Sequence, residues 1–404
     1  MAPLAPRHLF VGGRLPSALA LAALLAPALQ GCAACQSENN IVDKEPGDDD
    51  DDVQPDPVPP FTNDWGLWLS AGVMSDGSPA LAYYDATAKA AGFALGTVNA
   101  DGTVAWTHEQ PDGYPDADGL DPGDRGKYTS LAIAANDEVW ISYRDNQNKT
   151  LRYARRNAAG LWTNGVADPC AGPTPDCGLF SSIALDSGGN PVIAHYDAVG
   201  KHLRVARWNG SAFTAAVADE GLAPEGVEGA VADVGQFPRI RILNGVEYIS
   251  YYDVANGDLK LATGAAGAYT VETVDAEGDV GAWSDLQIVD GVIHVSYHDI
   301  GNEDLKYASG APGGFVAEVV DNGQTVGADT ALIVNSGAPQ ILYHDGRNND
   351  LRRAYKSAEL WQSDRVTGEQ GALGFHNEVI SAGGQLWAAS YNYTDRALWF
   401  STLN

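Results

Sequence analysis

A unit of roughly 50 residues recurs seven times between Gly66 and Asn404, and this repetition constrains the fold more than any single motif does. Three landmarks define the unit. The first is a Gly-x-aromatic step, the second is Tyr-x-Asp, and the third is an aromatic residue followed six positions later by Asp. Repeats of this length, when they are built from short strands, are typical of β-propellers and solenoids.

The landmarks keep the same order in successive units. The Gly-x-aromatic step begins at Gly66, Gly126, Gly178, Gly235 and Gly281. In the last two units the aromatic residue is replaced, giving Gly327-x-Asp329 and Gly374-x-His376. Tyr-x-Asp begins at Tyr83, Tyr143, Tyr251, Tyr297 and Tyr343, with His195 as a variant and Tyr391 as the aromatic of the seventh unit. The third landmark is Trp106/Asp112, Trp162/Asp168, Phe213/Asp219, Tyr269/Asp275 and Phe315/Asp321, with Trp361/Thr367 last.

The fifth unit shows most clearly what one repeat forms. Apolar or alternating stretches at 283–289, 292–297, 305–308 and 315–321 are separated by turn residues, which predicts four antiparallel strands. Seven such units predict an all-β fold, a seven-bladed β-propeller. The last unit has room for three strands only, and Phe61-Thr62 echoes Trp106-Thr107. We therefore expect residues near 58–64 to supply the outer strand of the last blade.

The first 60 residues differ in composition from the repeats. Residues 1–32 carry Arg7 and Arg14 before an Ala/Leu-rich run, which indicates a signal peptide. The end of this run, Leu29-Gln30-Gly31-Cys32, resembles the bacterial lipobox, and the resemblance implies lipidation of Cys32; a plain secretory signal is the alternative. Residues 33–60 are acidic and Pro-rich and indicate a disordered tether, so the propeller would occupy 61–404.

This organisation predicts a location in the cell envelope. Ala33 rather than Asp follows Cys32, and by resemblance to the enterobacterial sorting rule this favours an outer-membrane lipoprotein, periplasmic or surface-exposed. The membrane would then be contacted through the lipid anchor only.

The net charge limits the classes of partner. The chain carries −29, of which the tether contributes −8 and the signal +2, so about −23 remains for the repeats. A surface of this sign repels phosphate backbones, which excludes nucleic acid as a partner. We expect a monomer that binds a protein or a glycan.

Two cysteines lie in one connection between repeats. Cys170 and Cys177 bracket a short Pro- and Gly-containing loop, and this spacing predicts a disulfide, consistent with an oxidising compartment. A zinc site is the alternative, but it would need two further ligands nearby.

Three connections between repeats carry extra residues, at 111–127, 168–178 and 219–236. Insertions on neighbouring blades would form one raised edge, which we expect to be the binding face. The first insertion contains Asp116, Asp118, Asp121 and Asp124 among glycines, an arrangement of oxygen ligands that suits Ca²⁺. A solvated acidic loop is the favoured interpretation, and Ca²⁺ is the one candidate cofactor.

The last three units suggest a polar patch. His298 and His344 occupy the same repeat position, and His376 and Asp329 lie near them in register. The simpler interpretation is that this position tolerates any long polar group, since Tyr84, Arg144, Tyr196 and Tyr252 fill it elsewhere. The repeated Asp and Tyr of the second landmark are interpreted as structural, the Asp accepting turn N–H groups and the Tyr packing between blades.

The phrases Ser-Tyr-Tyr-Asp (250–253) and Ser-Tyr-His-Asp (296–299), each followed by Asp-Leu-Lys, resemble repeats of secreted and lipid-anchored bacterial propellers with a sialidase-like (BNR-type) fold. That resemblance implies the architecture. It does not supply an activity, because no complete Ser-x-Asp-x-Gly-x-x-Trp box is found and the three arginines, Tyr/Glu pair and Asp of a sialidase cannot be assembled. The favoured function is a non-catalytic binding or scaffolding module, with a carbohydrate-active enzyme, hydrolase or lyase, as the alternative.

Overall fold

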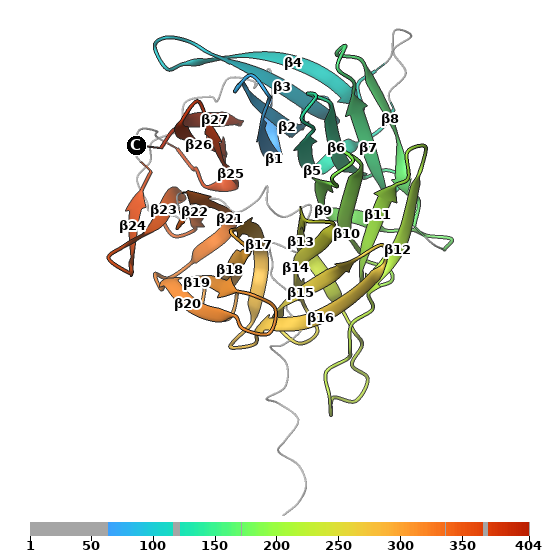
Figure 1. The fold of residues 1–404 in the computed structure, drawn as a ribbon, viewed down its shortest axis with the longest axis vertical. Coiled ribbons are helices and arrows are strands. Elements are labelled where there is room, and N and C mark those ends of the chain that lie inside the picture. The colour runs from blue at the N-terminus through green and yellow to red at the C-terminus, as the bar shows by residue number, and fades with distance from the viewer. Residues whose placement is uncertain (1–63, 116–121, 171, 336, 367–370, 404) are drawn as a thin grey trace, which may run out of the picture. The chain divides into compact units, whose positions relative to one another are not determined.

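The computed structural model describes residues 64–403, except for 116–121, 171, 336 and 367–370. In these residues 27 strands form seven antiparallel sheets and no helix is present. The sheets are arranged around a common axis, so the predicted seven-bladed β-propeller is confirmed (Figure 1). Accordingly, the described part contains no helix long and apolar enough to cross a membrane.

The first three blades are built as follows. Blade 1 contains β1 (Trp65–Val73), β2 (Pro79–Asp85), β3 (Ala90–Val98) and β4 (Val104–Asp112). Blade 2 contains β5 (Arg125–Ile133), β6 (Val139–Asp145), β7 (Thr150–Arg156) and β8 (Trp162–Asp168). Blade 3 contains β9 (Cys177–Leu185), β10 (Pro191–Asp197), β11 (His202–Trp208) and β12 (Phe213–Asp219).

The next three blades repeat this plan, and the seventh has three strands in the described residues. Blade 4 contains β13 (Val234–Leu243), β14 (Val246–Asp253), β15 (Asp258–Ala265) and β16 (Ala268–Asp275). Blade 5 contains β17 (Val280–Val289), β18 (Val292–Asp299), β19 (Asp304–Gly310) and β20 (Val316–Asp321). Blade 6 contains β21 (Val326–Asn335), β22 (Ala338–Asp345), β23 (Asp350–Ser357) and β24 (Leu360–Arg365), and blade 7 contains β25 (Phe375–Ala382), β26 (Gln385–Asn392) and β27 (Ala397–Thr402).

Strand order within each sheet follows the chain, with the first strand at the axis and the last at the rim (Figure 1). Because neighbouring strands are antiparallel, the connections between blades and the turns between second and third strands lie at one end of the propeller. We call this end the insertion face, because the three long connections follow β4, β8 and β12 as predicted. The turns between first and second strands lie at the opposite face.

Apolar clusters fill the spaces between blades. One cluster joins Ala82 and Phe93 of blade 1 to Ile141 and Tyr143 of blade 2, all of which are almost fully buried. Each inner strand therefore packs on a neighbour at both of its faces, and this explains why apolar residues interrupt the period-two alternation. Burial of such side chains supplies most of the free energy that holds the blades together.

The second and third landmarks hydrogen-bond to each other across blade boundaries. A Tyr hydroxyl donates to the Asp at the end of the preceding blade's fourth strand, as the predicted inter-blade role requires. The pairs are Tyr143–Asp112, Tyr251–Asp219 and Tyr297–Asp275, each at 2.6 Å, and Tyr343–Asp321 at 2.5 Å. The Asp of Tyr-x-Asp caps its own turn: Asp299, for example, accepts the backbone N–H of Asn302 at 2.9 Å.

The assignment of Tyr391 in the seventh repeat was wrong by one position. Tyr391 pairs with Phe375 across the sheet, whereas His344 of blade 6 pairs with Ala328. Tyr391 is therefore the counterpart of His344, and Asn392 takes the place of the turn aspartate. The side-chain amide oxygen of Asn392 accepts the N–H groups of Thr394 and Asp395, so it caps the turn as an aspartate does. Because Asn392 replaces the aspartate, the sequence pattern did not reveal the shift in register.

Blade 7 closes the ring against blade 1. The hydroxyl of Tyr391 donates to Asp64 at 2.6 Å, and Phe400 packs edge-on against Trp106 with ring centroids 5.1 Å apart. Leu69 and Leu81 share an apolar cluster with Ala389. The predicted fourth strand of blade 7 falls on residues 58–64, which lie outside the described part except for Asp64.

Candidate binding site at the propeller axis

The Gly-x-aromatic landmark forms a ring of side chains around the axis. At this point every first strand shifts register against its second strand, and one residue within this bulge has a φ between 46° and 57°. A non-glycine residue with positive φ is uncommon, and its recurrence in every blade shows that the bulge is a repeated device. We call these residues the axial ring: Trp68, Tyr128, Phe180, Phe237, Trp283, Asp329 and His376.

Members of the axial ring contact one another around the axis. Ring centroids are 5.3 Å apart for Trp68–Tyr128, 5.0 Å for Tyr128–Phe180, 4.4 Å for Phe180–Phe237, 4.9 Å for Phe237–Trp283 and 5.5 Å for Trp68–His376. Asp329 completes the polar side, with Oδ1 at 4.0 Å from His376 Nδ1. All seven side chains are half-buried, so each keeps part of its surface open to solvent.

A belt of hydrogen bonds fixes the ring in place. In five of the seven blades, the side chain of the residue that follows the ring member donates to the backbone carbonyl of the ring member in the preceding blade. Ser181 donates to Tyr128 at 2.7 Å, Thr330 donates to Trp283 at 2.7 Å, and Asn377 donates to Asp329 at 2.8 Å. These bonds tie the positions of adjacent ring members together, so the ring is preorganised rather than dependent on flexible loops.

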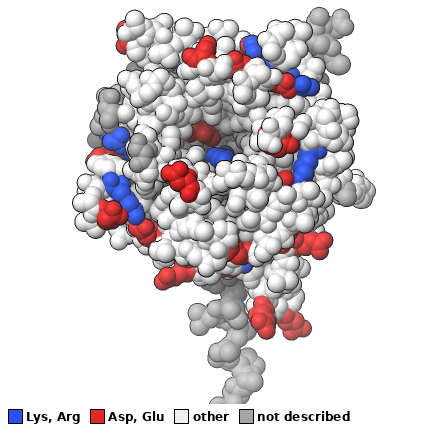
Figure 2. Space-filling model, viewed as in Figure 1, with Lys and Arg blue, Asp and Glu red and all other residues white. Residues whose placement is uncertain are grey.

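On the first strands of blades 4, 5 and 7, a charged side chain lies two residues after the axial-ring member. Arg239 of blade 4 approaches Asp285 of blade 5 with Nε–Oδ1 at 3.7 Å and Glu378 of blade 7 with Nη2–Oε1 at 3.7 Å. Blades 4 and 7 are not neighbours, so the second contact crosses the axis. We call these three residues the axial charge cluster. Figure 2 shows a hollow at the centre of the propeller in which both acidic and basic atoms are visible.

Glu378 has an unusual protonation equilibrium. Its side chain is 16% exposed, and burial raises its pKa from 4.5 to about 7 against the opposing effect of the Arg239 guanidinium. Asp285 adds to the upward shift through charge repulsion, and the backbone N–H of Ala71 lowers the pKa by hydrogen bonding. Such a carboxyl group changes its charge near neutral pH, which is characteristic of functional sites.

The polar-patch residues occupy two different environments. His376 and Asp329 belong to the axial ring, whereas His298 and His344 lie behind it, where His298 packs against Trp283 at 5.4 Å between centroids. Burial lowers the pKa of His298 to about 4 and also lowers that of His344. Within the described part of the chain, His298 Nδ1 and His344 Nε2 are buried without a hydrogen-bond partner.

The position of these two histidines links blades in the rest of the propeller. In the other blades, the residue just before the turn aspartate (before Asn392 in blade 7) pairs with a carboxylate of the next blade. That carboxylate belongs to the residue two positions before the landmark glycine. We call each such pair an axial latch. The latches are Tyr84–Asp124 at 2.8 Å, Arg144–Asp176 at 2.8 Å, Tyr196–Asp233 at 2.7 Å, Tyr252–Asp279 at 2.5 Å and Tyr391–Asp64 at 2.6 Å. After blades 5 and 6 the carboxylate is replaced by Thr325 and Ala372, so the histidines have no such acceptor.

The proposed calcium ligands fall mainly outside the described residues. Asp116, Asp118 and Asp121 lie in the segment 116–121, of which nothing is described. Asp124 accepts hydrogen bonds from Tyr84 at 2.8 Å and from Asn146 at 3.0 Å, one at each carboxylate oxygen. Asp124 thus serves as the carboxylate of an axial latch, and calcium binding stays a prediction.

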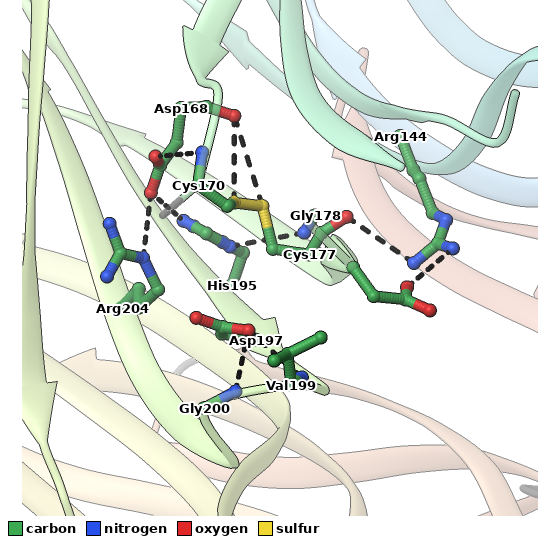
Figure 3. The surroundings of a disulfide bond; sticks show 11 residues. Arg144, Asp168, Cys170, Cys177, Gly178, His195, Asp197, Val199, Gly200 and Arg204 are labelled. Carbon is green, nitrogen blue, oxygen red and sulfur yellow. Dashed lines mark hydrogen bonds and ion pairs between the residues drawn. A yellow bond between two sulfur atoms is a disulfide. The ribbon is translucent and has the colours of Figure 1, made fainter. Parts of the chain in front are cut away.

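The predicted disulfide between Cys170 and Cys177 is present, with a Cα–Cα distance of 6.4 Å (Figure 3). Asp168 anchors the loop by accepting the N–H of Cys170 at 2.8 Å and Arg204 Nε at 2.8 Å. His195 Nε2 lies 3.2 Å from the same carboxylate, where other blades place a Tyr hydroxyl. Asp168, Cys177 and His195 converge within 4.8 Å, but the disulfide occupies the sulfur that a metal would require.

The third insertion exposes apolar side chains. Leu222, Val227 and Val231 lie between β12 and β13 with 81%, 60% and 59% of their surfaces exposed. Asn256 holds the loop at its base by donating to the carbonyl of Leu222 at 3.1 Å. The insertion face therefore offers apolar side chains in addition to the axial ring.

The axial charge cluster was missed by the sequence reasoning. The position four residues after the landmark glycine is Ser70, Ser130, Ser182 and Ala331 in four of the blades, but it is Arg239, Asp285 and Glu378 in the others. Aligning the repeats and comparing the residues at this position would have revealed the three charged side chains. Their convergence could not have been found, because it depends on blades 4 and 7 facing each other across the axis.

No protein-family model matches the chain, and no curated protein does either. Solved structures with a similar fold include a fucose-specific lectin from Aleuria aurantia, which is 14% identical with a TM-score of 0.46, the similarity covering 77% of this chain and 97% of the lectin. The polysaccharide lyase Uly1 is 11% identical with a TM-score of 0.47 over 83% of this chain and 90% of the lyase.

Sialidases are also among the similar structures. The intramolecular trans-sialidase from Ruminococcus gnavus is 10% identical with a TM-score of 0.44, covering 84% of this chain and 94% of that chain. These proteins are named for binding or cleaving carbohydrate. At such identities the similarity concerns the fold, and it assigns no residue of this chain to a function.

Proposed function

We propose that this propeller is a non-catalytic module that binds a neutral glycan at the axial ring. The observation that carries the proposal is the ring itself, in which five half-buried aromatic side chains surround one axis in mutual contact. Sugar rings present flat apolar faces that stack on aromatic surfaces, and a few polar groups then fix their orientation.

The polar groups near the axis suit hydroxyl ligands. Asp329 and His376 complete the ring, and Arg239 and Glu378 lie beneath it, so acceptors and donors are both available. Opposite charges are already paired within the cluster. The surface as a whole repels anions, which favours an uncharged glycan over an acidic one.

A glycan array followed by calorimetric titration tests this proposal. We expect an uncharged oligosaccharide to bind, and Trp68→Ala and Trp283→Ala each to weaken binding by roughly 10- to 100-fold, because each substitution removes one stacking surface. Trp361→Ala is the matched control, since Trp361 lies in β24 at the rim and should leave affinity unchanged. Equal affinity in wild type, W68A and W283A would reject the axial site.

A glycoside hydrolase or lyase is the second candidate, because Glu378 has the raised pKa of a general acid and lies near a second carboxylate, Asp285. Against this, Glu378 is held by Arg239 and by the N–H of Ala71, which gives it a positioning role between blades. Turnover of the oligosaccharide identified by the array, abolished by Glu378→Gln, would favour the enzyme over the binding module.

We further propose that the module is displayed on the cell envelope through a lipid on Cys32 and the tether of residues 33–60. The support is the lipobox-like sequence and the acidic, Pro-rich composition that follows it. Metabolic labelling with radioactive palmitate should mark the wild-type protein and not Cys32→Ser. Equal labelling of both proteins, or none of either, would contradict the anchor.

A further inference from the structure

A second candidate site lies between blades 2 and 3 at the opposite face. It is a pocket of 510 Å³ bordered by the turn that follows β5, the turn that follows β9, and the ends of β7 and β11. Tyr128 and Phe180 of the axial ring are near the starts of β5 and β9, whereas the pocket is at the ends of these strands. The pocket is therefore separated from the axial ring by the length of the first strands.

The wall of the pocket contains an unpartnered buried donor. Trp140 is only 2% exposed, and its indole Nε1 has no hydrogen-bond partner among the described residues. Buried polar groups in folded proteins are almost always hydrogen-bonded, so an orphaned donor in the wall of an open pocket indicates a ligand or a water that accepts from it.

The charged groups of the pocket all have hydrogen-bond partners. Arg155 binds Glu138 through two parallel hydrogen bonds, Nε–Oε1 at 2.5 Å and Nη2–Oε2 at 3.0 Å. Its guanidinium also stacks on Trp140, 5.1 Å from the ring centroid. Asp186 accepts the N–H groups of Gly188 and Asn190, each at 2.8 Å. An anion would thus find no unpaired cation in the pocket, because its arginine is already paired with Glu138 and Asp186 adds a negative charge.

The pocket adds aromatic surface to this polar wall. Trp208 of blade 3 lies with its ring 5.5 Å from that of Trp140 and is partly buried. Arg155 is the cross-strand partner of Trp140, so one pair of residues on β6 and β7 builds the wall. The corresponding positions on the second strands of the other blades are Ala80, Val192, Tyr248, His294, Gln340 and Trp387. The indole Nε1 of Trp387 donates to the carbonyl of Ala382 at 3.3 Å, whereas that of Trp140 has no partner among the described residues.

We propose that this pocket binds one residue of an uncharged, polyhydroxylated ring compound, a neutral monosaccharide or cyclic polyol. Its hydroxyl groups accept from the Trp140 indole and from Arg155 and donate to Glu138, while its apolar face contacts Trp208. The site goes beyond the proposed axial function and does not depend on it, because the two sites share no residue.

Saturation-transfer NMR with a panel of free glucose, galactose, mannose, fucose, xylose and myo-inositol tests this proposal on the whole propeller. We expect at least one probe to bind the wild type, and Trp140→Phe, which keeps an aromatic ring but removes the N–H, to weaken that binding by 10-fold or more. Arg155→Ala should do the same, and because Arg155 is 40% exposed this variant is expected to fold normally.

Four outcomes decide the matter. Loss of probe binding in W140F and R155A, with binding kept in Trp68→Ala, supports the pocket. Loss in W68A alone assigns the sugar to the axial ring and overturns the pocket while leaving the proposed function intact. Binding by neither the wild type nor any variant overturns the pocket. Displacement of the bound sugar by sodium acetate or sodium sulfate would show an anion site and overturn the neutral class.

Discussion

At the scale of single residues, Glu378 is the side chain whose protonation equilibrium the propeller shifts toward neutral pH. It occupies a position where other blades use a serine to accept the next blade's backbone N–H, as Ser130 does for Ile183 at 3.1 Å. Glu378 performs the same role for Ala71 but brings a carboxyl group into a buried environment next to Arg239. The repeat therefore supplies the position, and one substitution within it supplies a titratable group at the axis.

This shift predicts a specific pH dependence of stability. The pKa of Glu378 is raised from 4.5 to about 7, so between these values the folded protein retains a proton that the unfolded chain releases. The stabilising contribution of protonated Glu378 is therefore fully present below pH 4.5 and is lost as the pH rises through 7, which lowers the free energy of unfolding by ~3 kcal/mol. We expect Glu378→Gln to lack this loss, since glutamine resembles the protonated form at every pH.

Urea unfolding of the wild type and E378Q at pH 4.5 and pH 8 measures this effect. The difference in unfolding free energy between the two proteins should shift in favour of E378Q on going to pH 8. Glu225→Gln, an exposed acid on the third insertion, is the control and should follow the wild type at both pH values. A difference between E378Q and wild type that does not change with pH would show that the Glu378 pKa is ordinary.

At the scale of the elements, the blades are connected by two kinds of repeated polar contact. Tyr–Asp hydrogen bonds join the second strand of one blade to the fourth strand of the blade before it, and axial latches join the second strand to the start of the blade after it. The latches are replaced at the boundaries between blades 5 and 6 and between blades 6 and 7. The part of the ring that contains Asp329 and His376 is therefore the part with the fewest latches.

Restoring a latch should strengthen the boundary between blades 5 and 6. The double substitution His298→Tyr with Thr325→Asp recreates the arrangement of Tyr84 and Asp124, in which the tyrosine also packs edge-on against Trp68. Thr325 has a φ of 64°, a conformation that Asp tolerates better than a β-branched residue does. We expect the double variant to be more stable than the wild type by about 1 kcal/mol.

Thermal and denaturant unfolding of the double variant and both single variants checks this expectation. Each single change should be neutral or destabilising, because it supplies only one partner, so the gain belongs to the pair. A double variant whose stability equals the sum of the two single effects would contradict the latch interpretation.

At the scale of the whole molecule, seven similar blades form a closed ring with two unlike faces. The insertion face carries the axial ring and the three long connections, and the opposite face carries the pocket beside Trp140. Closure makes the axial site possible, because Arg239 and Glu378 meet only when blades 4 and 7 stand on opposite sides of one axis. Tyr391 and Asp64 complete that closure.

The repeated features were accessible from the sequence, and the features that depend on closure were not. The blade number, the turn aspartates, the packing of the repeated Tyr between blades and the Cys170–Cys177 disulfide follow from local patterns, and the structure confirms them. The partner of each Tyr hydroxyl, the Asp at the end of the preceding blade, was not predicted. The seventh repeat was misaligned because Asn392 caps its turn as an aspartate does. The axial charge cluster was not predicted from the sequence, because its members are far apart along the chain and come together only when the ring of blades closes.

The most direct test of the central claim is a crystal structure of the propeller grown with the uncharged oligosaccharide that binds most tightly on the array. We predict density for a sugar ring stacked on the axial aromatics, with its hydroxyl groups within hydrogen-bonding distance of Asp329, His376 or Arg239. A sugar bound elsewhere with the axis containing solvent only would contradict the assignment of the axial ring as the binding site.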